Sequence, residues 1–310
     1  MRNIRYWWDK NFWPNRYLFL MFLPGLLYFI IFCYIPMGGI IIAFKDYSPW
    51  IGILKSPWVG LKHFQDFFSS PYAWRLIRNT LLLNIYGLIF GFPIPIIFAL
   101  LLNELASEWY KKMVQTLTYF PYFLSMPIVA GLVIQLLSPS SGIINIILVK
   151  WFGREPIYFL TKPEYFRTIY ISANIWRSMG YSAIIYLAAL TGIDPTLYEA
   201  AIIDGANRWQ RVRFITLPGL TPTITILLIL SMGSILSVGI DLILLLYNPM
   251  TYETADVIGT FVYRRGIAGI GGAPDLGLGT AVGLFQSVVG LVTIMLVNNI
   301  ARRISETSLW

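Results

Sequence analysis

Cysteine and histidine are almost absent from this sequence of 310 residues, which contains one of each, Cys33 and His63. A single cysteine cannot form a disulfide framework, and one histidine with one cysteine cannot supply a zinc site. No G-x-x-x-x-G-K-[ST] motif occurs, so the chain has no loop of its own for ATP phosphates. The sequence therefore predicts no catalytic residue, no metal site and no cofactor bound by this chain.

Charged residues are also scarce, at 12% of the chain, where a soluble domain carries about 25%. The mean hydropathy is +0.66. A helix needs about 20 apolar residues to cross a bilayer, and a bilayer offers no partner to unpaired backbone groups. The sequence therefore predicts an all-α polytopic membrane protein with six transmembrane helices, over residues 17–44, 79–103, 113–149, 168–191, 221–247 and 266–301.

The basic residues give only a weak indication of orientation. Arg2, Arg5, Lys10 and Arg16 in the N-terminal tail favour a cytoplasmic N-terminus, and six spans return the C-terminus to the same side. The lysines and arginines outside the predicted spans, however, divide equally, with 11 on each side. The net charge of +8 fits contact with anionic lipid headgroups. The scatter of these residues argues against nucleic-acid binding.

One polar segment, residues 194–218, separates two of the apolar runs. Asp194 followed by Pro195 is typical of a helix start, and Gly205 supplies the freedom for a sharp turn. Asn207 with a glutamine three residues later predicts a second helix start. That second helix is expected to stop before Pro218. The pattern predicts a short helix to about residue 204, a turn and a second helix.

The first of these two helices has features of a contact surface. Ala200 and Ala201 give it a low-relief face that a partner can approach closely. Glu199 and Asp204 offer acceptors for arginine or lysine across an interface. An amphipathic helix that rests on lipid headgroups is an equally good interpretation of these features alone.

The same residues resemble the EAA loop of the permeases of binding-protein-dependent ABC importers, E-A-A-x3-G-x9-I-x-L-P. The sugar-type branch that includes the LplB polysaccharide permeases shows further similarities, at residues 176–195, 78–80 and 142–145. This resemblance extends over residues 17–303 and implies the type I importer permease fold, also called MetI-like. The residues that it implies in ATPase coupling are Glu199, Ala200, Ala201, Asp204, Gly205, Ala206, Ile215, Leu217 and Pro218.

The resemblance also implies the partners. A cytoplasmic ATPase dimer would hold ATP and Mg and would move the permease between two states through this loop, which must then be cytoplasmic. A second homologous permease, most often a different chain, would complete the pathway. An extracellular lipoprotein or a periplasmic binding protein would deliver the solute. The expected location is the plasma membrane of a prokaryote, among its lipids and with both termini cytoplasmic.

The expected domains follow from the same comparison. Residues 1–16 form a cytoplasmic tail, 17–74 the first span and an external loop, 75–303 the importer domain, and 304–310 a second tail. The expected solute is an oligosaccharide, including acidic or complex polysaccharide fragments. Another solute such as glycerol phosphate, or an ion-coupled secondary transporter, is the alternative.

Two charges, Arg177 and Asp241, fall inside predicted spans at similar depth. A charge at the bilayer centre costs about 2.5–3.5 kcal/mol, so each needs a partner or water. A salt bridge between them is one interpretation. In another, Arg177 faces the pathway and grips a sugar carboxylate, with Asp241, Trp176 and Tyr181 beside the route. In a third, one of the two charges reaches the headgroups.

Overall fold

The computed structural model describes residues 13–270, 272–304 and 308–309. These residues fall into two compact units. One contains the described residues through Phe67 together with Arg265–Leu284, and the other contains Phe68–Arg264 and the described residues from Phe285 onward. Most of the predicted tails 1–16 and 304–310 lie outside the described residues. Across the described ranges the chain is helical, with a single isolated β-bridge between Lys45 and Trp58.

In the first unit, the predicted first span is confirmed as a helical segment, Arg16–Phe44. Its parts are α2 (Arg16–Phe29), η2 (Ile30–Tyr34), α3 (Ile35–Met37) and η3 (Gly38–Phe44). None of its most apolar stretch is buried within the chain. An apolar helix exposed all round is suited to lipid or to another membrane protein.

A short loop region completes this unit and includes α4 (Gly52–Lys55) and the first part of α5 (Lys62–Ser69). His63 is buried, and its Nε2 lies 3.0 Å from the carbonyl oxygen of Lys45. Asp275 accepts a hydrogen bond from the backbone N–H of Leu278 at 2.8 Å. This contact caps the start of α18 (Leu276–Ile304), which continues into the second unit.

The second unit begins with the second predicted span, which is one helical segment, Ala73–Asn103, and starts six residues earlier than predicted. It contains α6 (Ala73–Tyr86), η4 (Gly87–Gly91) and α7 (Pro93–Asn103). The π-helical turn η4 ends two residues before Pro93, whose missing N–H costs nothing at the first position of α7.

The prediction of one helix over residues 113–149 is wrong. The segment divides into α8 (Glu108–Tyr119) with η5 (Phe120–Phe123), then α9 (Met126–Leu137), and then α10 (Ile143–Phe152). The axes of the first two parts meet at 102°. Prolines in η5 and at the start of α9 remove backbone donors at this bend. A run without charges therefore does not guarantee one straight helix.

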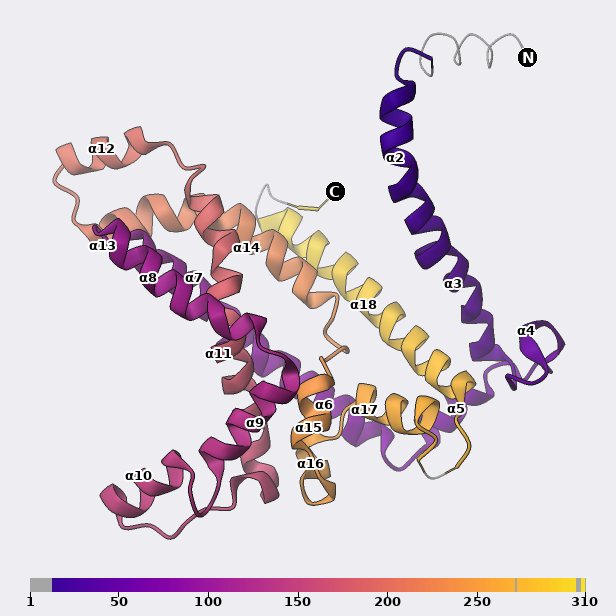
Figure 1. Ribbon diagram of the computed structural model, residues 1–310. Helices are drawn as coiled ribbons and strands as arrows, with labels where there is room; N and C mark the ends of the chain where they lie inside the picture. Colours follow the sequence, from indigo (N-terminus) through magenta and orange to yellow (C-terminus); the bar gives the residue numbers. More distant parts are fainter. Residues whose placement is uncertain (1–12, 271, 305–307, 310) are drawn as a thin grey trace. The chain divides into compact units, whose positions relative to one another are not determined.

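The fourth predicted span is α11 (Pro163–Leu190), the central helix of the second unit. Gly180 lies so close to the backbone of Thr118 that a Cβ atom there would overlap it. α11 therefore crosses α8 at very short range. Toward one end of α11 lies α12 (Pro195–Ile203), and α10 and α16 (Tyr252–Ala255) lie toward the other end (Figure 1).

The fifth span differs from its prediction at both ends. Its helix covers Arg208–Met232, through α13 (Arg208–Arg211), η7 (Val212–Thr216) and α14 (Leu217–Met232). It ends where a glycine- and serine-rich segment begins, and Asp241 instead starts the separate short helix α15 (Asp241–Leu246). The placement of Asp241 inside a long span is therefore wrong.

The remaining elements are short until the last helix. They are η8 (Pro249–Thr251), α16, α17 (Ile258–Val262) and η9 (Tyr263–Ile267). The boundary between the two units falls within η9, after Arg264. The C-terminal part of α18 packs against the end of α14, where a Cβ on Gly290 would overlap the carbonyl of Gly233. Small residues therefore allow α14 and α18 to approach each other closely within this chain.

Four helical segments in the described chain are long and apolar enough to cross a membrane, or five if the bent pair counts as one span. The helix α11 is long enough, at 28 residues, but it carries polar and charged side chains along its length. The all-helical membrane architecture is confirmed, whereas the number six stays a prediction.

Candidate functional site

The loop between α11 and α13 forms the helix, turn and helix that the sequence predicts. Asp194 caps α12 by accepting a hydrogen bond from the backbone N–H of Thr196 at 2.9 Å, with Pro195 at the first helical position. This hydrogen bond lowers the pKa of the Asp194 carboxyl. The cap therefore stays ionised at neutral pH, where its negative charge also suits the helix N-terminus.

The other end of α12 closes in a Schellman motif. The N–H of Ala206 donates to the carbonyl of Ala201 at 2.8 Å, and the N–H of Gly205 donates to that of Ile202 at 3.0 Å. Gly205 has φ +77°, a left-handed conformation that glycine adopts without steric cost. A Cβ there would meet no atom within 4 Å, so backbone conformation, not space, explains the glycine.

The second helix begins with the predicted capping box. Asn207 accepts from the N–H of Gln210 at 2.9 Å, and Gln210 accepts from the N–H of Asn207 at 2.8 Å. The predicted stop before Pro218 is wrong, because Pro218 lies at the first turn of α14 and the helix continues through it. The π-helical turn η7 lies just before Pro218 and lets the helix continue although the proline has no backbone N–H to donate.

The surface of this loop is open. Glu199, Ala200 and Asp204 are exposed, and within the described chain neither acid forms an ion pair. Ile203 and Trp209 are 86% and 69% exposed. Ala201, Ala206, Ile215 and Leu217 are half-buried, and Pro218 is exposed. The loop therefore satisfies its own backbone internally and presents apolar and acidic side chains outward.

The predicted pathway residues divide into separate environments. Arg177 donates through Nη2 to the carbonyl of Tyr122 at 3.1 Å, and its guanidinium lies 5.0 Å from the Tyr122 ring centroid. The ring of Tyr181 stacks on the ring of Tyr122, with the two centroids 3.8 Å apart and the two planes nearly parallel. Arg177, Tyr122 and Tyr181 therefore form one cation–aromatic layer at the bend before α9.

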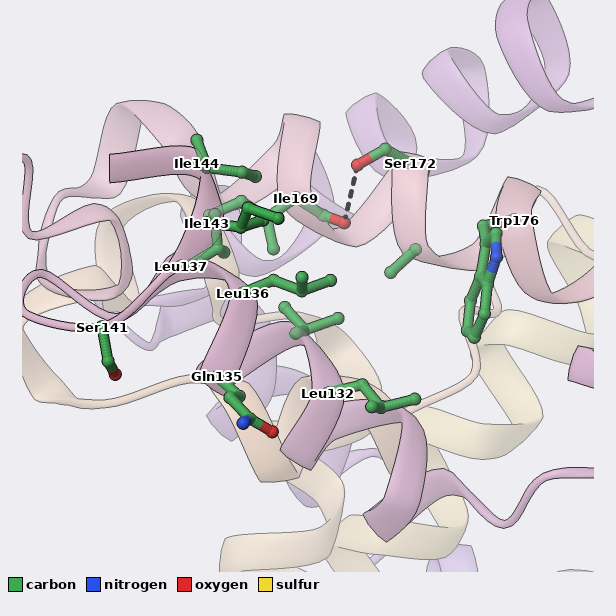
Figure 2. Close-up of a pocket in the computed structure, with 12 residues that line it drawn as sticks. Leu132, Gln135, Leu136, Leu137, Ser141, Ile143, Ile144, Ile169, Ser172 and Trp176 are labelled. Atoms are coloured by element: carbon green, nitrogen blue, oxygen red, sulfur yellow. Dashed lines mark hydrogen bonds between the residues drawn. The ribbon is translucent and has the colours of Figure 1, made fainter. Parts of the chain in front are cut away.

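Trp176 lies elsewhere, since consecutive residues of a helix point in different directions. It lines one end of a pocket of about 620 Å³ between α9, α10 and α11 (Figure 2). Ser172, also in its wall, donates back to the carbonyl of Thr168 in its own helix at 2.7 Å. The wall is mostly aliphatic, with Gln135, Ser141 and Ser172 as its polar side chains, and offers a saccharide few hydrogen-bond partners. The pathway role predicted for Trp176 gains no support from this pocket.

Asp241 is exposed and forms no ion pair with Arg177. The interpretation of the two as a salt bridge is therefore wrong. The reason is the early end of the fifth helix, which moves Asp241 out of the span that was expected to hold it at the depth of Arg177.

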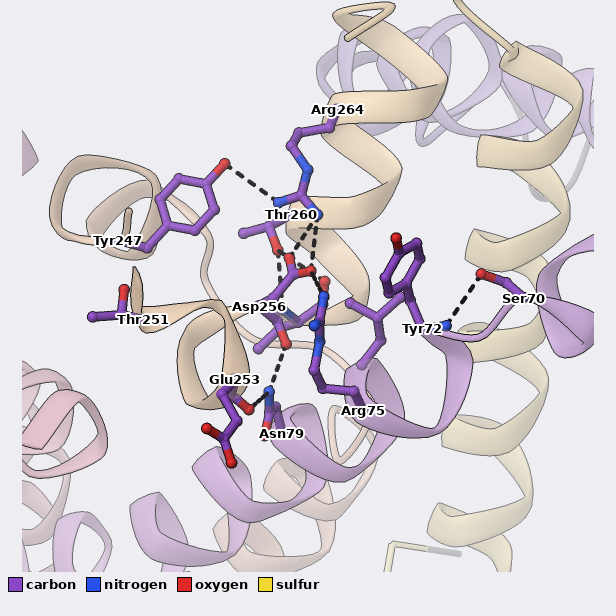
Figure 3. Close-up of polar contacts among 12 residues, drawn as sticks. Ser70, Tyr72, Arg75, Asn79, Tyr247, Thr251, Glu253, Asp256, Thr260 and Arg264 are labelled. Atoms are coloured by element: carbon purple, nitrogen blue, oxygen red, sulfur yellow. Dashed lines mark hydrogen bonds and ion pairs between the residues drawn. The ribbon is translucent and has the colours of Figure 1, made fainter. Parts of the chain in front are cut away.

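A buried ionic cluster at the other end of α11 was missed by sequence reasoning (Figure 3). The Asp256 side chain is 1% exposed and pairs with Arg75 at 3.1 Å and with Arg264 at 2.8 Å. It also accepts a hydrogen bond from Thr260 at 2.7 Å. Burial by itself would lower the pKa of Arg264, but Tyr247 and Asp256 outweigh it, so the pKa of this guanidinium is raised.

No spacing in the sequence joins these groups, because Arg75 and Asp256 are 181 residues apart. The one available signal was the position of Arg75 and Arg78 just before the second apolar run. Arginines at the end of a span are usually assigned to lipid headgroups. Only the tertiary fold shows that Arg75 faces a carboxylate.

An all-helical membrane chain with an exposed, well-capped helix between two long helices is suited to the class of polytopic membrane subunits that engage a separate partner. The particular family follows from comparison. The family described as "Binding-protein-dependent transport system inner membrane component" matches residues 91–306, and the chain belongs to it. The protein is therefore a non-enzymatic ABC importer permease of the inner membrane.

Two relatives from Bacillus subtilis (strain 168) are similar over nearly the whole chain. The polygalacturonan/rhamnogalacturonan transport system permease protein YteP is 46% identical over 96% of this chain and 91% of its own length. Protein LplB is 44% identical over 98% of this chain and 94% of its own length. The predicted resemblance to the LplB branch is confirmed.

A solved structure is equally similar. A chain of a bacterial alginate ABC transporter, crystallised with an alginate pentasaccharide-bound periplasmic protein, matches with a TM-score of 0.86 and 47% sequence identity. The match covers 97% of this chain and 99% of that chain. The predicted importer permease fold is confirmed.

Proposed function

We propose that this permease imports acidic oligosaccharides and that the α12 loop couples it to a cytoplasmic ATPase. The observation that carries the substrate class is the near full-length similarity to permeases for polygalacturonan and alginate. Both are polymers of uronic acids. The side chains of the second unit agree with this class, because arginine guanidinium groups, among them that of Arg177, match carboxylates in geometry.

The proposed coupling rests on the form of the α12 loop. Its caps fix the helix without help from outside, while Glu199, Asp204 and Ile203 project away from the chain. A helix held rigidly at both ends can transmit a push, whereas a flexible loop would absorb it. ATP and Mg would be held by the partner, and Glu199 would pair with one of its basic residues.

In this proposal a second, homologous permease completes the pathway and a binding protein delivers the saccharide from outside. The α12 loop is cytoplasmic, and so are both termini. Arg177 with Tyr181 would lie along the pathway, since an aromatic face and a guanidinium together suit a sugar ring with a carboxylate. Asp241 and Trp176 have no comparable support.

The test uses the assembled importer in proteoliposomes with its binding protein and a uronic-acid oligosaccharide. Reversal of charge in Glu199→Lys removes the proposed ion pair and places like charges opposite each other. Uptake should fall at least tenfold, while the detergent-purified permease pair stays intact. Glu155→Lys is the matched control, because Glu155 is also exposed but lies in a predicted external loop.

Two results would contradict different parts of the proposal. Equal uptake by Glu199→Lys and wild type would remove the coupling role of α12. Import of neutral oligosaccharides alone by the wild type would remove the substrate class and leave the coupling role standing.

A further inference from the structure

The ionic cluster around Asp256 contains more positive charge than its single carboxylate balances. Arg75 and Arg264 already share Asp256, whose two carboxylate oxygens accept bonds from both arginines and from Thr260. The carboxylate is therefore fully used by these three partners. Any further arginine in the cluster has to find another counter-charge.

Two further arginines lie in this cluster and contact only neutral groups. Asn79 links them to Asp256, because its side-chain amide donates to the carbonyl oxygens of Glu253 at 2.9 Å and Asp256 at 3.0 Å. Arg167 donates to the side-chain oxygen of Asn79 at 3.1 Å, and Arg78 donates to the carbonyl of Glu253 at 3.3 Å. Four guanidinium groups thus belong to a network with one buried carboxylate, which two of them contact directly, while Arg78 and Arg167 are connected only through neutral groups.

The surrounding acids do not neutralise this excess. Glu253 and Glu164 are exposed, and neither forms an ion pair in the described part of the chain. The Nε atoms of Arg78 and Arg167 are buried and have no hydrogen-bond partner. Both arginine side chains are half-buried, so each guanidinium is partly desolvated and partly accessible. The buried Nε atoms are out of reach of a ligand, but the Nη groups of these partly desolvated cations each make only one hydrogen bond, to a neutral oxygen, and are suited to an anionic ligand.

The cluster lies at the end of α11 opposite the α12 loop. Thr254, next to Glu253, donates to the carbonyl of Pro163 at the start of α11 at 2.6 Å. The helix then continues for 28 residues, about 42 Å, before the α12 loop follows. If α12 is cytoplasmic, as proposed above, this cluster is at the external side, where an imported saccharide arrives.

We propose that Arg78 and Arg167 form a carboxylate-binding site that receives the acidic saccharide at the external side of the permease. The inference rests on the proposed function. Arg75 and Arg264 hold the site's framework through Asp256, and Asn79 sets the position of Arg167. Each of the two receiving guanidiniums can offer a paired set of N–H donors to one uronate carboxylate.

The direct test is equilibrium dialysis of the purified permease–ATPase complex with a galacturonate oligosaccharide, without binding protein. The double variant Arg78→Gln, Arg167→Gln should raise the dissociation constant about tenfold, because two charge-assisted contacts are lost. Arg154→Gln, which removes an exposed arginine of a predicted external loop, should leave it unchanged. A carboxyl-reduced oligosaccharide should bind equally to wild type and double variant.

The inference is overturned if the double variant binds the galacturonate oligosaccharide as well as the wild type does, or if wild-type binding is undetectable. Equal loss of both oligosaccharides would assign the two arginines to the framework instead and would also overturn it. If the double variant does not assemble, Arg78→Gln alone decides, because Arg78 gives up only a 3.3 Å contact to a backbone carbonyl. Uptake by the wild type, measured separately, tests the proposed function by itself.

Discussion

At the scale of single residues, Asp256 is a buried charge that connects distant segments of the second unit. It is buried and joins α6 to the segment that follows α16 through Arg75 and Arg264. Removal of one partner from a buried ion pair leaves uncompensated charge and costs about 3–5 kcal/mol. In this cluster it would leave four arginines without any buried acid.

We therefore expect Asp256→Asn, which keeps the shape of the side chain, to lower the thermal unfolding temperature of the detergent-solubilised permease markedly. Asp241→Asn is the control, since Asp241 is exposed and forms no ion pair in the described part of the chain. This substitution should change the free energy of unfolding by no more than about 0.5 kcal/mol. Similar unfolding temperatures for the two variants would show that the cluster does not stabilise the fold.

Single residues also show where sequence reasoning succeeded. Asp194, Gly205 and the pair of Asn207 with Gln210 act within a few positions of themselves, so their roles as caps and turn could be predicted from local chemistry. Asp256 could not be placed, because its partners come from distant parts of the chain. A residue's local role is thus visible in sequence, and its long-range role is not.

At the scale of elements, prolines and small residues decide how the helices run. The chain bends by 102° before α9 but continues through Pro218. In the sequence, the bend before α9 and Pro218 have the same pattern, which is a proline near an apolar run. The difference is the π-helical turn η7, which precedes Pro218 and cannot be predicted from composition.

The contact between α14 and α18 gives a test at this scale. A methyl group at Gly290 would overlap the Gly233 carbonyl, and a backbone atom cannot move aside without shifting a helix. We expect Gly290→Ala to destabilise the permease by about 1–3 kcal/mol, measured by thermal unfolding.

The control for this prediction lies in the same helix. A Cβ at Gly283 would meet no atom within 4 Å, so Gly283→Ala should be neutral or stabilise by up to about 1 kcal/mol through helix propensity. If Gly290→Ala behaved like Gly283→Ala, the close approach of the two helices would be contradicted.

At the scale of the whole molecule, the ionic cluster explains why charge counting was indecisive. The 11 basic residues counted on the external side include Arg75, Arg78, Arg167 and Arg264, all four of the cluster. The positive-inside rule assumes that external loops have no special use for positive charge. Under the proposed function these arginines have such a use, so they mask the asymmetry that would reveal orientation.

The proposal places the α12 loop in the cytoplasm and in contact with the ATPase, and one labelling experiment tests both statements. Cys33 is first replaced by serine, and single cysteines are introduced at Ile203, Leu54 and Glu253. Leu54 is 92% exposed and is therefore accessible to a thiol reagent.

The most direct measurement is the rate at which a membrane-impermeant thiol reagent labels a cysteine at Ile203 in inside-out vesicles, with and without the ATPase bound. We expect rapid labelling of the permease alone, strong protection by the ATPase, and labelling of Leu54→Cys and Glu253→Cys only in right-side-out vesicles. Labelling of Ile203→Cys from outside, or at the same rate with the ATPase bound, would contradict the claim that α12 couples this permease to its ATPase.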